Sequence, residues 1–306
     1  MRSGAGRQSR TLIIFPGALG DLICFLPAVH ALHARHLETT LELMARWELA
    51  QFAVDRTPIV QAHSIDRLEV AQLFGAAQNI EAARHFFGNF TRTYSFFALH
   101  NDQFRTTLAA LAPEASFYPF RPLGAGHVAR AYLDSLGLRW RNTPDVPVDL
   151  LPADTAAART LLARAGLGAR PFLLLLPGSG SRAKNWPAPN FVALARLVEP
   201  RIKPVCLLGP AETELKAMLH AAGIATLEGL ELGEVAALAA HAHLFVGNDS
   251  GVSHLAAAVG APGVVLFGPT DPERWCPLGA VRVVRGETMA KLSVESVADA
   301  IALCQS

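Results

Sequence analysis

The chain has 306 residues, of which 51% are hydrophobic and 17% are charged. This composition predicts a globular protein with large buried sheets and excludes a disordered chain. Its 27 Lys and Arg nearly balance its 26 Asp and Glu, which gives a formal net charge of +1. The chain therefore lacks the broad basic footprint of sequence-independent nucleic-acid binding, and we expect no nucleic-acid partner.

The N-terminal region predicts a strand, a glycine loop and a helix. Thr11–Phe15 is a short, bulky strand, and Gly17 and Gly20 separate it from an apolar helix at about Leu22–Ala34. The loop lacks the GxGxxG fingerprint of dinucleotide-binding folds. Asp21 lies at the carboxyl edge of the predicted sheet, where open α/β folds bind their ligands. It could be an N-terminal helix cap or a functional carboxylate.

The same region imitates a secretory signal peptide, because three arginines precede an apolar run. Glycines, a proline and Asp21 divide that run, so we interpret it as part of the mature fold and expect a cytoplasmic protein. We expect no transmembrane segment either, because Gly and Pro interrupt the apolar stretch Gly251–Pro269, which falls short of ~20 apolar residues. The four cysteines are far apart and form no CxxC pair, as is typical of a reducing compartment.

Strands that alternate with helices predict a mostly parallel sheet in the first half of the chain. The expected elements are strands at Thr40–Ala45, Pro58–Ile65 and Ser95–Leu99 and helices at Glu48–Val54, Arg67–Phe74, Phe104–Leu111 and His127–Gly137. The aromatic cluster at His85–Phe90 has no clean period and could be core or a substrate-facing loop. Trp140–Asp154 carries three prolines and no helical period, which predicts a linker between domains at 1–150 and 151–306.

The second half restarts the pattern with a buried strand at Pro171–Leu176 and a glycine-rich loop at 177–187. The pattern GxxxxGK[ST] is absent, so this loop is not a P-loop. It still has the parts of a phosphate cradle: two glycines that expose backbone N–H groups, two serine hydroxyls and one mobile lysine charge. These residues are Gly178, Gly180, Ser179, Ser181 and Lys184. The later expected elements are helices at Pro189–Val198, Leu232–His241 and Val294–Cys304 and strands at Val205–Leu208, Ala225–Leu227 and Ala280–Val284.

The stretch LFVGNDSGVSHLAAAVGAPGVVLFGPTDP, residues 244–272, predicts a strand, a loop, a helix and a second strand. Asp249 and Ser250 are N-cap residue types, and an Ala-rich helical run follows them. The helix start would place backbone N–H groups of Ser250, Gly251 and Val252 where they and the helix dipole favour a phosphate. The alternative is a capped helix in an ordinary α/β domain.

Three motifs, in the right order along the chain, together resemble glycosyltransferase family 9, the ADP-heptose:lipopolysaccharide heptosyltransferases. The first is GALGDL at 17–22 with Pro27, and the second is PGSGS at 177–181 with Lys184, Trp186 and Pro187. The third and most specific is NDSG at 248–251 with HLA at 254–256 and FGPTDP at 267–272. Between Asp21 and Pro171 the resemblance is limited to the general layout.

The resemblance implies an α/β protein of the GT-B fold, with two Rossmann-like domains whose mostly parallel sheets face a central cleft. The acceptor would bind the N-terminal domain and the nucleotide sugar the C-terminal domain, and the last helix could pack back on the N-terminal domain. The implied catalytic residues are Asp21, as general base, and Lys184, on the donor phosphates.

The resemblance also implies donor-binding residues outside the two loops. Glu212, a weaker match, corresponds to a carboxylate on the nucleotide ribose, and Asp249 to a donor-site aspartate. On charge grounds we expect Asp249 to cap a helix or bind a sugar hydroxyl, and the phosphate to be left to neighbouring N–H groups. Gly17, Gly20 and His254 belong to the matched motifs and complete the implied donor site.

The implied chemistry is an inverting transfer. A carboxylate can take the proton of an acceptor hydroxyl as the new bond forms, and the leaving nucleoside diphosphate can be stabilised by a lysine and a helix N-terminus. No DxD motif occurs, so we expect no metal and no other cofactor. A single base without a second nucleophile predicts inversion at the anomeric carbon.

The resemblance implies two substrates: a nucleotide sugar, with ADP-heptose as the family's donor, and a hydroxyl of a glycan or lipopolysaccharide core. Such a lipid-linked acceptor would lie at the cytoplasmic face of the inner membrane, where the protein could bind peripherally. Two other functions stay open. One is a sugar-nucleotide epimerase or hydrolase of the same fold, and the other is a non-catalytic module that binds sugar nucleotides or glycans.

Overall fold

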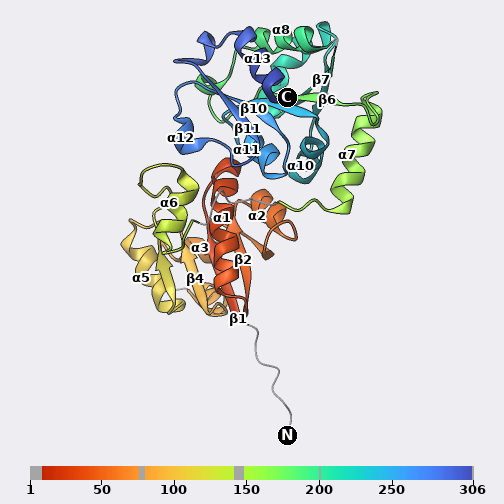
Figure 1. Cartoon of the computed structure of the whole chain (residues 1–306). Coiled ribbons are helices and arrows are strands. Elements are labelled where there is room, and N and C mark those ends of the chain that lie inside the picture. The colour runs from red at the N-terminus through yellow and green to blue at the C-terminus, as the bar shows by residue number, and fades with distance from the viewer. Residues whose placement is uncertain (1–8, 76–79, 141–147, 200, 305–306) are drawn as a thin grey trace. The chain divides into compact units, whose positions relative to one another are not determined.

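The computed structural model describes residues 9–75, 80–140, 148–199 and 201–304. The chain forms two compact units, and Figure 1 labels many of their helices and strands. We call them unit 1, which comprises Met1–Ala18 and Phe25–Trp140, and unit 2, which comprises Leu19–Cys24 and Arg141–Ser306. Helix α1 (Leu19–Arg35) therefore begins in unit 2 and continues in unit 1.

Unit 1 is built on a parallel sheet whose described strands have the order β3-β2-β1-β4-β5. These strands are β1 (Ser9–Ile14), β2 (Thr39–Ala45), β3 (Ile59–Ser64), β4 (Arg92–Ser95) and β5 (Ala115–Phe117). Besides α1, the described helices are α2 (Trp47–Ala53), α3 (Leu68–Gln72), α4 (Glu81–Phe87), α5 (Asp102–Leu111) and α6 (Val128–Ser135). The predicted mostly parallel sheet is confirmed.

Unit 2 repeats this architecture with a parallel sheet in the order β11-β10-β9-β6-β7-β8 among its described strands. The strands are β6 (Phe172–Leu176), β7 (Lys203–Leu208), β8 (Ala225–Glu228), β9 (Leu244–Asn248), β10 (Gly263–Phe267) and β11 (Val281–Arg285). The α-helices are α7 (Pro152–Arg164), α8 (Ala188–Val198), α9 (Lys216–Ala221), α10 (Leu232–His241), α11 (Gly251–Ala258), α12 (Pro272–Trp275) and α13 (Val294–Cys304). Short 3-10 helices occupy Arg182–Lys184, Pro210–Leu215 and Met289–Lys291.

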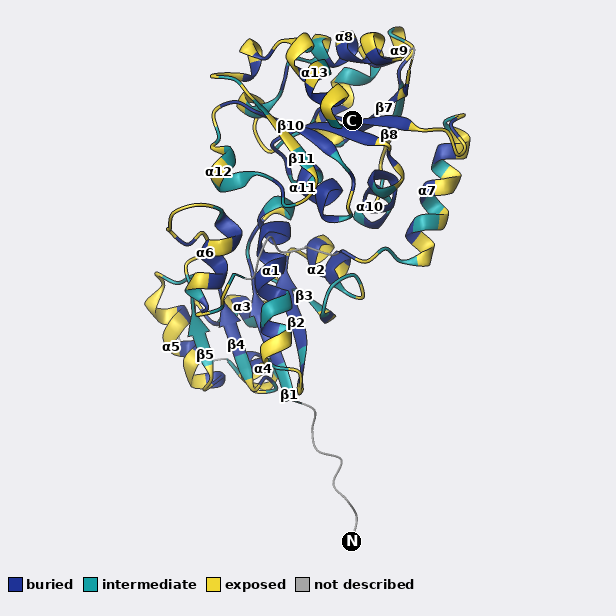
Figure 2. Ribbon diagram, viewed as in Figure 1, coloured by how far each residue is buried: buried dark blue, intermediate teal, exposed yellow. Residues whose placement is uncertain are grey.

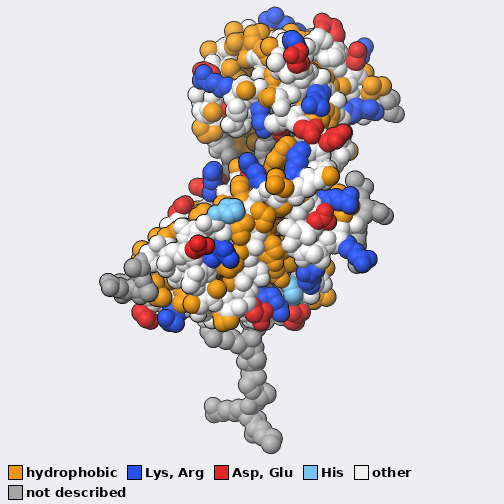
Figure 3. Space-filling model, turned by 90° about the vertical axis from the view of Figure 1, so that its left-hand side faces the viewer, with side chains coloured by type: hydrophobic (Ala, Val, Ile, Leu, Met, Phe, Trp, Pro, Cys, Tyr) orange, Lys and Arg blue, Asp and Glu red, His pale blue; other side chains and the backbone are white. Residues whose placement is uncertain are grey.

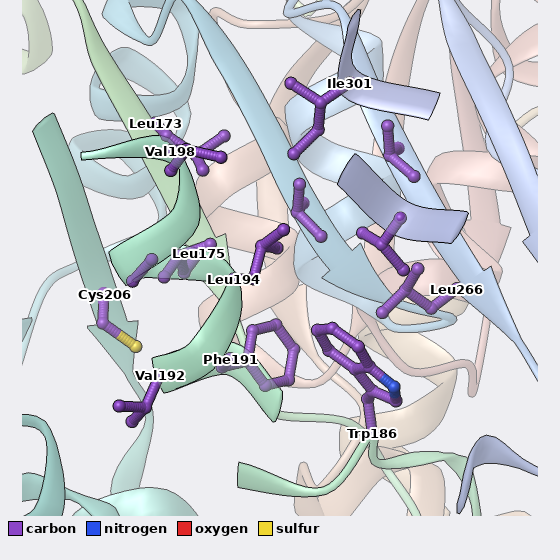
Figure 4. Close-up of a cluster of buried hydrophobic side chains, with 14 of the residues drawn as sticks. Leu173, Leu175, Trp186, Phe191, Val192, Leu194, Val198, Cys206, Leu266 and Ile301 are labelled. Atoms are coloured by element: carbon purple, nitrogen blue, oxygen red, sulfur yellow. The ribbon is translucent and has the colours of Figure 1, made fainter. Parts of the chain in front are cut away.

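The strands of unit 2 are apolar because helices cover both faces of a parallel sheet. Strands β6, β9 and β10 are buried along their whole length, whereas β11 at the sheet edge is partly exposed (Figure 2). One face packs against α8 and α13, where Trp186 and Phe191 meet edge to face with ring centroids 5.0 Å apart (Figure 4). Leu266 of β10 and Ile301 of α13 belong to the same cluster.

The surface carries charges of both signs. On the face that Figure 3 shows, Lys and Arg side chains are interspersed with Asp and Glu side chains. Among the described helices we find none with the length and apolar character of a membrane span.

One predicted strand of unit 1 is wrong. Ser95–Leu99 was expected to be a strand because it is apolar, but β4 ends at Ser95. The Ser95 hydroxyl donates to the carbonyl of Phe97 (3.0 Å) and accepts from its N–H (3.3 Å), which turns the chain. Ala98 then has a positive φ of 52°, which an extended strand cannot accommodate. The stretch is apolar because side chains are buried after the end of the strand, where Phe96 is 1% exposed.

In three further stretches the structure differs from the prediction or decides between its alternatives. The aromatic cluster His85–Phe90 is core: it forms the end of α4 and the turn after it, and Phe87 and Phe90 are buried. Helix α1 begins at Leu19, earlier than expected. Of the predicted linker, residues 141–147 lie outside the described residues, and its last part begins helix α7 with a proline in the first turn.

Candidate functional site

Unit 2 brings its functional residue types to one edge of the sheet. Strands β6, β7, β9 and β10 are parallel, so the segments that follow them meet at their carboxyl ends. Those segments begin at Pro177, Gly209, Asp249 and Gly268. They carry most of the predicted donor-binding residues.

Asn248 fixes the glycine-rich loop to the sheet. Its side chain, which is fully buried at the end of β9, donates to the carbonyl of Pro177 (2.7 Å) and accepts from the N–H of Trp186 (3.1 Å). The indole of Trp186 donates in turn to the carbonyl of Leu292 (2.9 Å). Both ends of the loop are therefore held in place, which gives Asn248 a structural role within its motif.

Asp249 holds two other polar side chains of the site through one carboxylate oxygen. Its Oδ2 atom accepts from the ammonium of Lys184 (2.7 Å) and from the hydroxyl of Thr270 (2.7 Å). Asp249 is only 5% exposed, whereas the Lys184 side chain is 30% exposed. A buried carboxylate thus holds a partly exposed ammonium at the edge of the loop. No role for Thr270 was predicted from the sequence.

Helix α11 begins with a capped first turn, as predicted by the alternative in which residues 244–272 contain a capped helix of an ordinary α/β domain. The hydroxyl of Ser250 accepts from the N–H of Ser253 (3.3 Å), and the Ser253 hydroxyl donates to the carbonyl of Asn248 (2.7 Å). The cap does not use the first N–H groups of the helix, which at Gly251 and Val252 have no partner within a regular α-helix. A cap and an anion-binding helix start are therefore compatible here.

Gly251 is needed because another backbone passes close to it. A Cβ atom at this position would lie 2.9 Å from the nitrogen of Gly20 and 2.9 Å from the Cβ of Leu19. The close approach brings the first turn of α1 beside the first turn of α11. Asp21 is the third residue of α1 and is buried, so it is not the N-cap residue that the cap hypothesis required. Gly17, in contrast, belongs to unit 1.

Two buried side chains complete this contact. The Sγ atom of Cys24 lies 3.5 Å from Nδ1 of His254, and Nε2 of the same ring lies 4.0 Å from Oδ1 of Asp249. Burial, reinforced by the charges of Asp21 and Asp249, raises the pKa of the Cys24 thiol well above its ordinary value. Cys24 was missed by the sequence analysis, because a contact between residues so distant in sequence leaves no local pattern.

A pocket of about 400 Å³ lies beside the glycine-rich loop. Its polar lining residues are Ser179, Ser181, Arg182, Asn185, Glu212 and Glu214. Arg182 and Glu214 were not among the predicted site residues. Arg182 adds a positive charge to the lining of this pocket, and Glu214 adds a second carboxylate besides that of Glu212.

Two glycines accommodate the carboxylate of Glu212 in this pocket. The N–H of Gly209 donates to its Oε2 (3.0 Å), and a Cβ atom on Gly178 would come within 2.7–2.9 Å of the carboxylate atoms. Gly178 thus makes room for the carboxylate. A carboxylate with one oxygen anchored by a backbone N–H can still accept hydrogen bonds from a diol through the other oxygen.

The two serines and the second glycine of the loop have different surroundings. The Ser179 hydroxyl interacts with the carbonyl of Ser181 (2.8 Å) and with the side chain of Asn185, so it shapes the loop. Ser181 is exposed, and a Cβ atom on Gly180 would meet nothing within 4 Å. Of these residues, Ser181 has the more accessible hydroxyl for an anion.

The site is suited to a phosphorylated ligand with hydroxyl groups. Lys184, Arg182 and the start of α11 offer positive charge and N–H donors, whereas Glu212 offers an acceptor for hydroxyls. Among the described residues, no group of three or more His, Cys, Asp or Glu side chains is arranged to hold a metal ion.

Comparison with known proteins identifies a family and a fold. The chain matches the family model of glycosyltransferase family 9 (heptosyltransferase) over residues 142–300, just over half of its length. It is 33% identical over 135 residues to lipooligosaccharide heptosyltransferase 2 of Haemophilus influenzae, which covers 40% of this chain and 39% of that protein. It is 31% identical over 176 residues to lipopolysaccharide heptosyltransferase 3 of Escherichia coli, which covers 53% of this chain and 50% of that one. The matches thus span half or less of these relatives.

Solved structures share the fold over nearly the whole chain. A family 9 glycosyltransferase of Veillonella parvula superposes with a TM-score of 0.81, at 19% identity over 97% of each chain. The ADP-heptose lipopolysaccharide heptosyltransferase II of Escherichia coli gives 0.75, at 19% identity over 96% of this chain and 98% of that one. An Escherichia coli heptosyltransferase solved with ADP gives 0.71, at 20% identity over 96% and 99%. At such identities the likeness shows the fold, which is two Rossmann-like units of the GT-B type.

Proposed function

Because the chain belongs to glycosyltransferase family 9, we propose that it is an inverting glycosyltransferase. The donor is a nucleoside-diphosphate sugar, with ADP-heptose as the first candidate, and the acceptor is a hydroxyl of a glycan or lipopolysaccharide core. The names of the curated relatives and the ADP bound to one structural neighbour support this choice.

One observation carries the proposal: a single edge of unit 2 combines a lysine, a helix start and a carboxylate pocket. Lys184 is presented by Asp249 at 2.7 Å, and the pocket that contains Glu212 has a volume of about 400 Å³. Pockets for small ligands are of this order of size. A diphosphate at Lys184 and the start of α11, with its ribose toward Glu212, accounts for all three features.

The proposed reaction needs one base and a stabilised leaving group. The acceptor oxygen attacks the anomeric carbon as the bond from that carbon to the diphosphate oxygen breaks, and the carboxylate of Asp21 takes the acceptor proton. The leaving nucleoside diphosphate gains negative charge, which Lys184 and the N–H groups of α11 stabilise. Attack opposite the leaving group inverts the anomeric configuration.

We assign the donor to the C-terminal domain at 151–306 and the acceptor to the N-terminal domain at 1–150. Because a lipopolysaccharide acceptor is lipid-linked, we place the reaction at the cytoplasmic face of the inner membrane. This assignment follows from the family and from the donor-type residues at the edge of the unit 2 sheet.

A two-part experiment tests the proposal. Thermal shift with ADP-, GDP-, UDP- and dTDP-sugars identifies the donor, and transfer to a deacylated lipopolysaccharide core is then measured by mass spectrometry. We expect stabilisation by the ADP-sugar and a mass increase of the acceptor by one sugar. Donor breakdown that is independent of acceptor would indicate a hydrolase, and a change in the donor sugar alone would indicate an epimerase. Binding without turnover under any acceptor would indicate a binding module.

A further inference from the structure

The imidazole of His254 lies between the first turns of α1 and the aspartate that holds the site lysine. Its Nδ1 atom is 3.5 Å from the Sγ atom of Cys24, and its Nε2 atom is 4.0 Å from Oδ1 of Asp249. All three residues are nearly inaccessible, with exposed fractions of 4%, 1% and 5% for His254, Cys24 and Asp249. Water therefore competes little for these contacts, and the ring nitrogens must be satisfied inside the protein.

We infer that Cys24 is a positioning residue for the donor site. Its thiol fixes one tautomer of His254, the tautomer that turns an N–H toward Asp249, and so keeps Asp249 and its partner Lys184 in place. The inference rests on the proposed function, because that function assigns Lys184 to the donor diphosphate.

The direction of the hydrogen bond follows from the two groups that face the ring nitrogens, the thiol at Nδ1 and the carboxylate at Nε2. Burial is the main cause that raises the pKa of Cys24, and the nearby charges of Asp21 and Asp249 raise it further, so the S–H proton is retained. A protonated thiol can donate to Nδ1 or accept from it, whereas an ionised carboxylate can only accept. Of the two neutral tautomers, only the one with its proton on Nε2 serves both contacts, because it donates toward Asp249 and accepts from the thiol at Nδ1.

The ring is also held by packing against α1. A Cβ atom on Gly20 would lie 3.4 Å from Cδ2 of His254, so the ring rests against the backbone of this turn. Gly20 and Cys24 are four residues apart and share one helix face. One face of α1 therefore supports the ring through contact at Gly20 and orients it through the thiol.

The charged and titratable groups around the ring explain why its tautomer affects the lysine. Asp21 lies on α1, and Asp249 follows β9 and pairs with Lys184. Cys276 follows α12, and the charge of Asp249 contributes to the raised pKa of its thiol. An N–H toward Oδ1 attracts the Asp249 carboxylate, whose Oδ2 holds the lysine. A lone pair in its place would repel the carboxylate and loosen the pair.

The experiment compares variants that differ only in what faces Nδ1. Cys24→Ser keeps a proton donor, whereas Cys24→Ala removes it. If the alanine variant does not fold, Cys24→Val replaces it, because valine also lacks a donor but fills more of the buried volume. Cys304→Ala is the matched control, since this thiol lies on α13 and interacts with the carbonyl of Gly263 and with Arg282, and with no residue that the inference invokes.

Two readouts are measured on the full chain. The 15N chemical shifts of the His254 ring report which nitrogen carries the proton, with His254→Gln used to assign the signals among the 11 histidines. Isothermal titration with ADP reports the affinity of the donor site. We expect a proton on Nε2 in the wild type, in Cys24→Ser and in Cys304→Ala. In Cys24→Ala we expect a shift toward Nδ1–H and roughly two- to tenfold weaker ADP binding, the size expected from one hydrogen bond.

Each outcome bears on one proposal. An unchanged tautomer and unchanged ADP affinity in Cys24→Ala would overturn the inference and leave Cys24 as packing. A lower melting temperature alone, with the same tautomer, would do the same. If ADP binds to no variant, wild type included, the proposed donor site is wrong, and the tautomer comparison still decides whether Cys24 orients the ring.

Discussion

Lys184 and Asp249 form an ion pair in which the two partners differ in exposure: the ammonium lies 2.7 Å from a carboxylate that is almost completely buried. The aspartate cannot relax into solvent, so it sets the position of the lysine. The hydroxyl of Thr270 binds the same oxygen at 2.7 Å and fixes it from a second side. An anion that binds at Lys184 therefore meets an ammonium with a defined place, and less conformational entropy is lost on binding.

Replacing Lys184 should weaken donor binding. A charge-assisted contact is worth about 1.5–3 kcal/mol, so Lys184→Ala should raise the donor KM or Kd about 10- to 150-fold and lower kcat. Lys184→Met keeps most of the stem and should be almost as impaired if the charge is what matters. Lys203→Ala, at an exposed lysine paired with Glu199, is the control. Normal kinetics in Lys184→Met would contradict the assignment of this loop to the phosphates.

Replacing Asp21 should remove turnover and leave donor binding intact. Loss of a general base costs roughly 10²–10⁴-fold in rate, and Asn cannot accept the proton. Asp154→Asn is a close control, because Asp154 is also a buried third residue of a helix, α7, where it accepts from the N–H of Leu151 (3.3 Å). The measurements are kcat, ADP affinity and melting temperature for both variants. Turnover of Asp21→Asn at the wild-type rate would show that Asp21 serves the helix only.

Transfer should continue in EDTA. The sequence contains no DxD motif, and Lys184 with the first turn of α11 can neutralise the leaving diphosphate. The check is the transfer rate after dialysis against EDTA, compared with the rate after adding Mg²⁺ or Mn²⁺. Activity that disappears in EDTA and returns with either cation would refute the prediction.

Gly251→Ala should destabilise the protein more than Gly180→Ala. The new methyl group at residue 251 would come within 2.9 Å of the backbone of Gly20, whereas at residue 180 it would meet nothing within 4 Å. Forced packing of this kind costs about 1–3 kcal/mol, and an alanine in open space can be slightly stabilising. Urea denaturation of both variants measures the difference. Equal stability would mean that the two helix starts separate without cost.

A buried carboxylate in unit 1 should make stability depend on pH. Glu42 is 2% exposed and accepts from Arg10 (2.6 and 2.9 Å) and His63 (2.7 Å). Burial, the largest influence, acts to raise its pKa, but the hydrogen bonds from His63 and Arg10 outweigh it and the pKa falls below its ordinary value. The ionised form is thus favoured by folding, and its stabilisation is present above the ordinary pKa of 4.5 and is lost as the pH falls through the lowered value.

The comparison of Glu42→Gln with the wild type tests this sign. At pH 7 the variant loses the charge-assisted hydrogen bonds of Glu42 with Arg10 and should be about 1.5–3 kcal/mol less stable. The difference should shrink below about pH 4.5. Glu81→Gln, at an exposed side chain 3.9 Å from Arg84, should change stability little at any pH. A difference between Glu42→Gln and wild type that stays constant down to pH 3 would contradict the assigned pKa shift.

The fold could be predicted from sequence wherever the local pattern and the tertiary packing agree. Apolar runs such as Phe172–Leu176 and Gly263–Phe267 become buried parallel strands because helices cover both faces. The prediction fails at Ser95–Leu99, where the apolar residues are buried in a loop. It also missed β5, because Ala115–Phe117 is too short to show a period, and α7, because its proline resembles linker sequence.

The candidate site was predictable only in part, for a similar reason. Glycines, serines and a lysine close together in sequence identify a loop that can bind phosphate, and this loop lies at the carboxyl edge of the unit 2 sheet. The pairing of Lys184 with Asp249 joins residues 65 positions apart, and that of Cys24 with His254 joins residues 230 positions apart. Such contacts depend on the tertiary fold, and one sequence does not encode them in any local pattern.

The division of α1 between the two units constrains how this protein can be recombined with its relatives. The chain passes between the units at 18/19, 24/25 and 140/141, so a single crossover near residue 141 would take Leu19–Cys24 from one parent and the rest of unit 2 from the other. A chimera made in this way would pair a foreign glycine turn, carboxylate and thiol with a native α11. An exchange of unit 2 between relatives therefore keeps this unit intact only if the six residues Leu19–Cys24 are exchanged together with Arg141–Ser306.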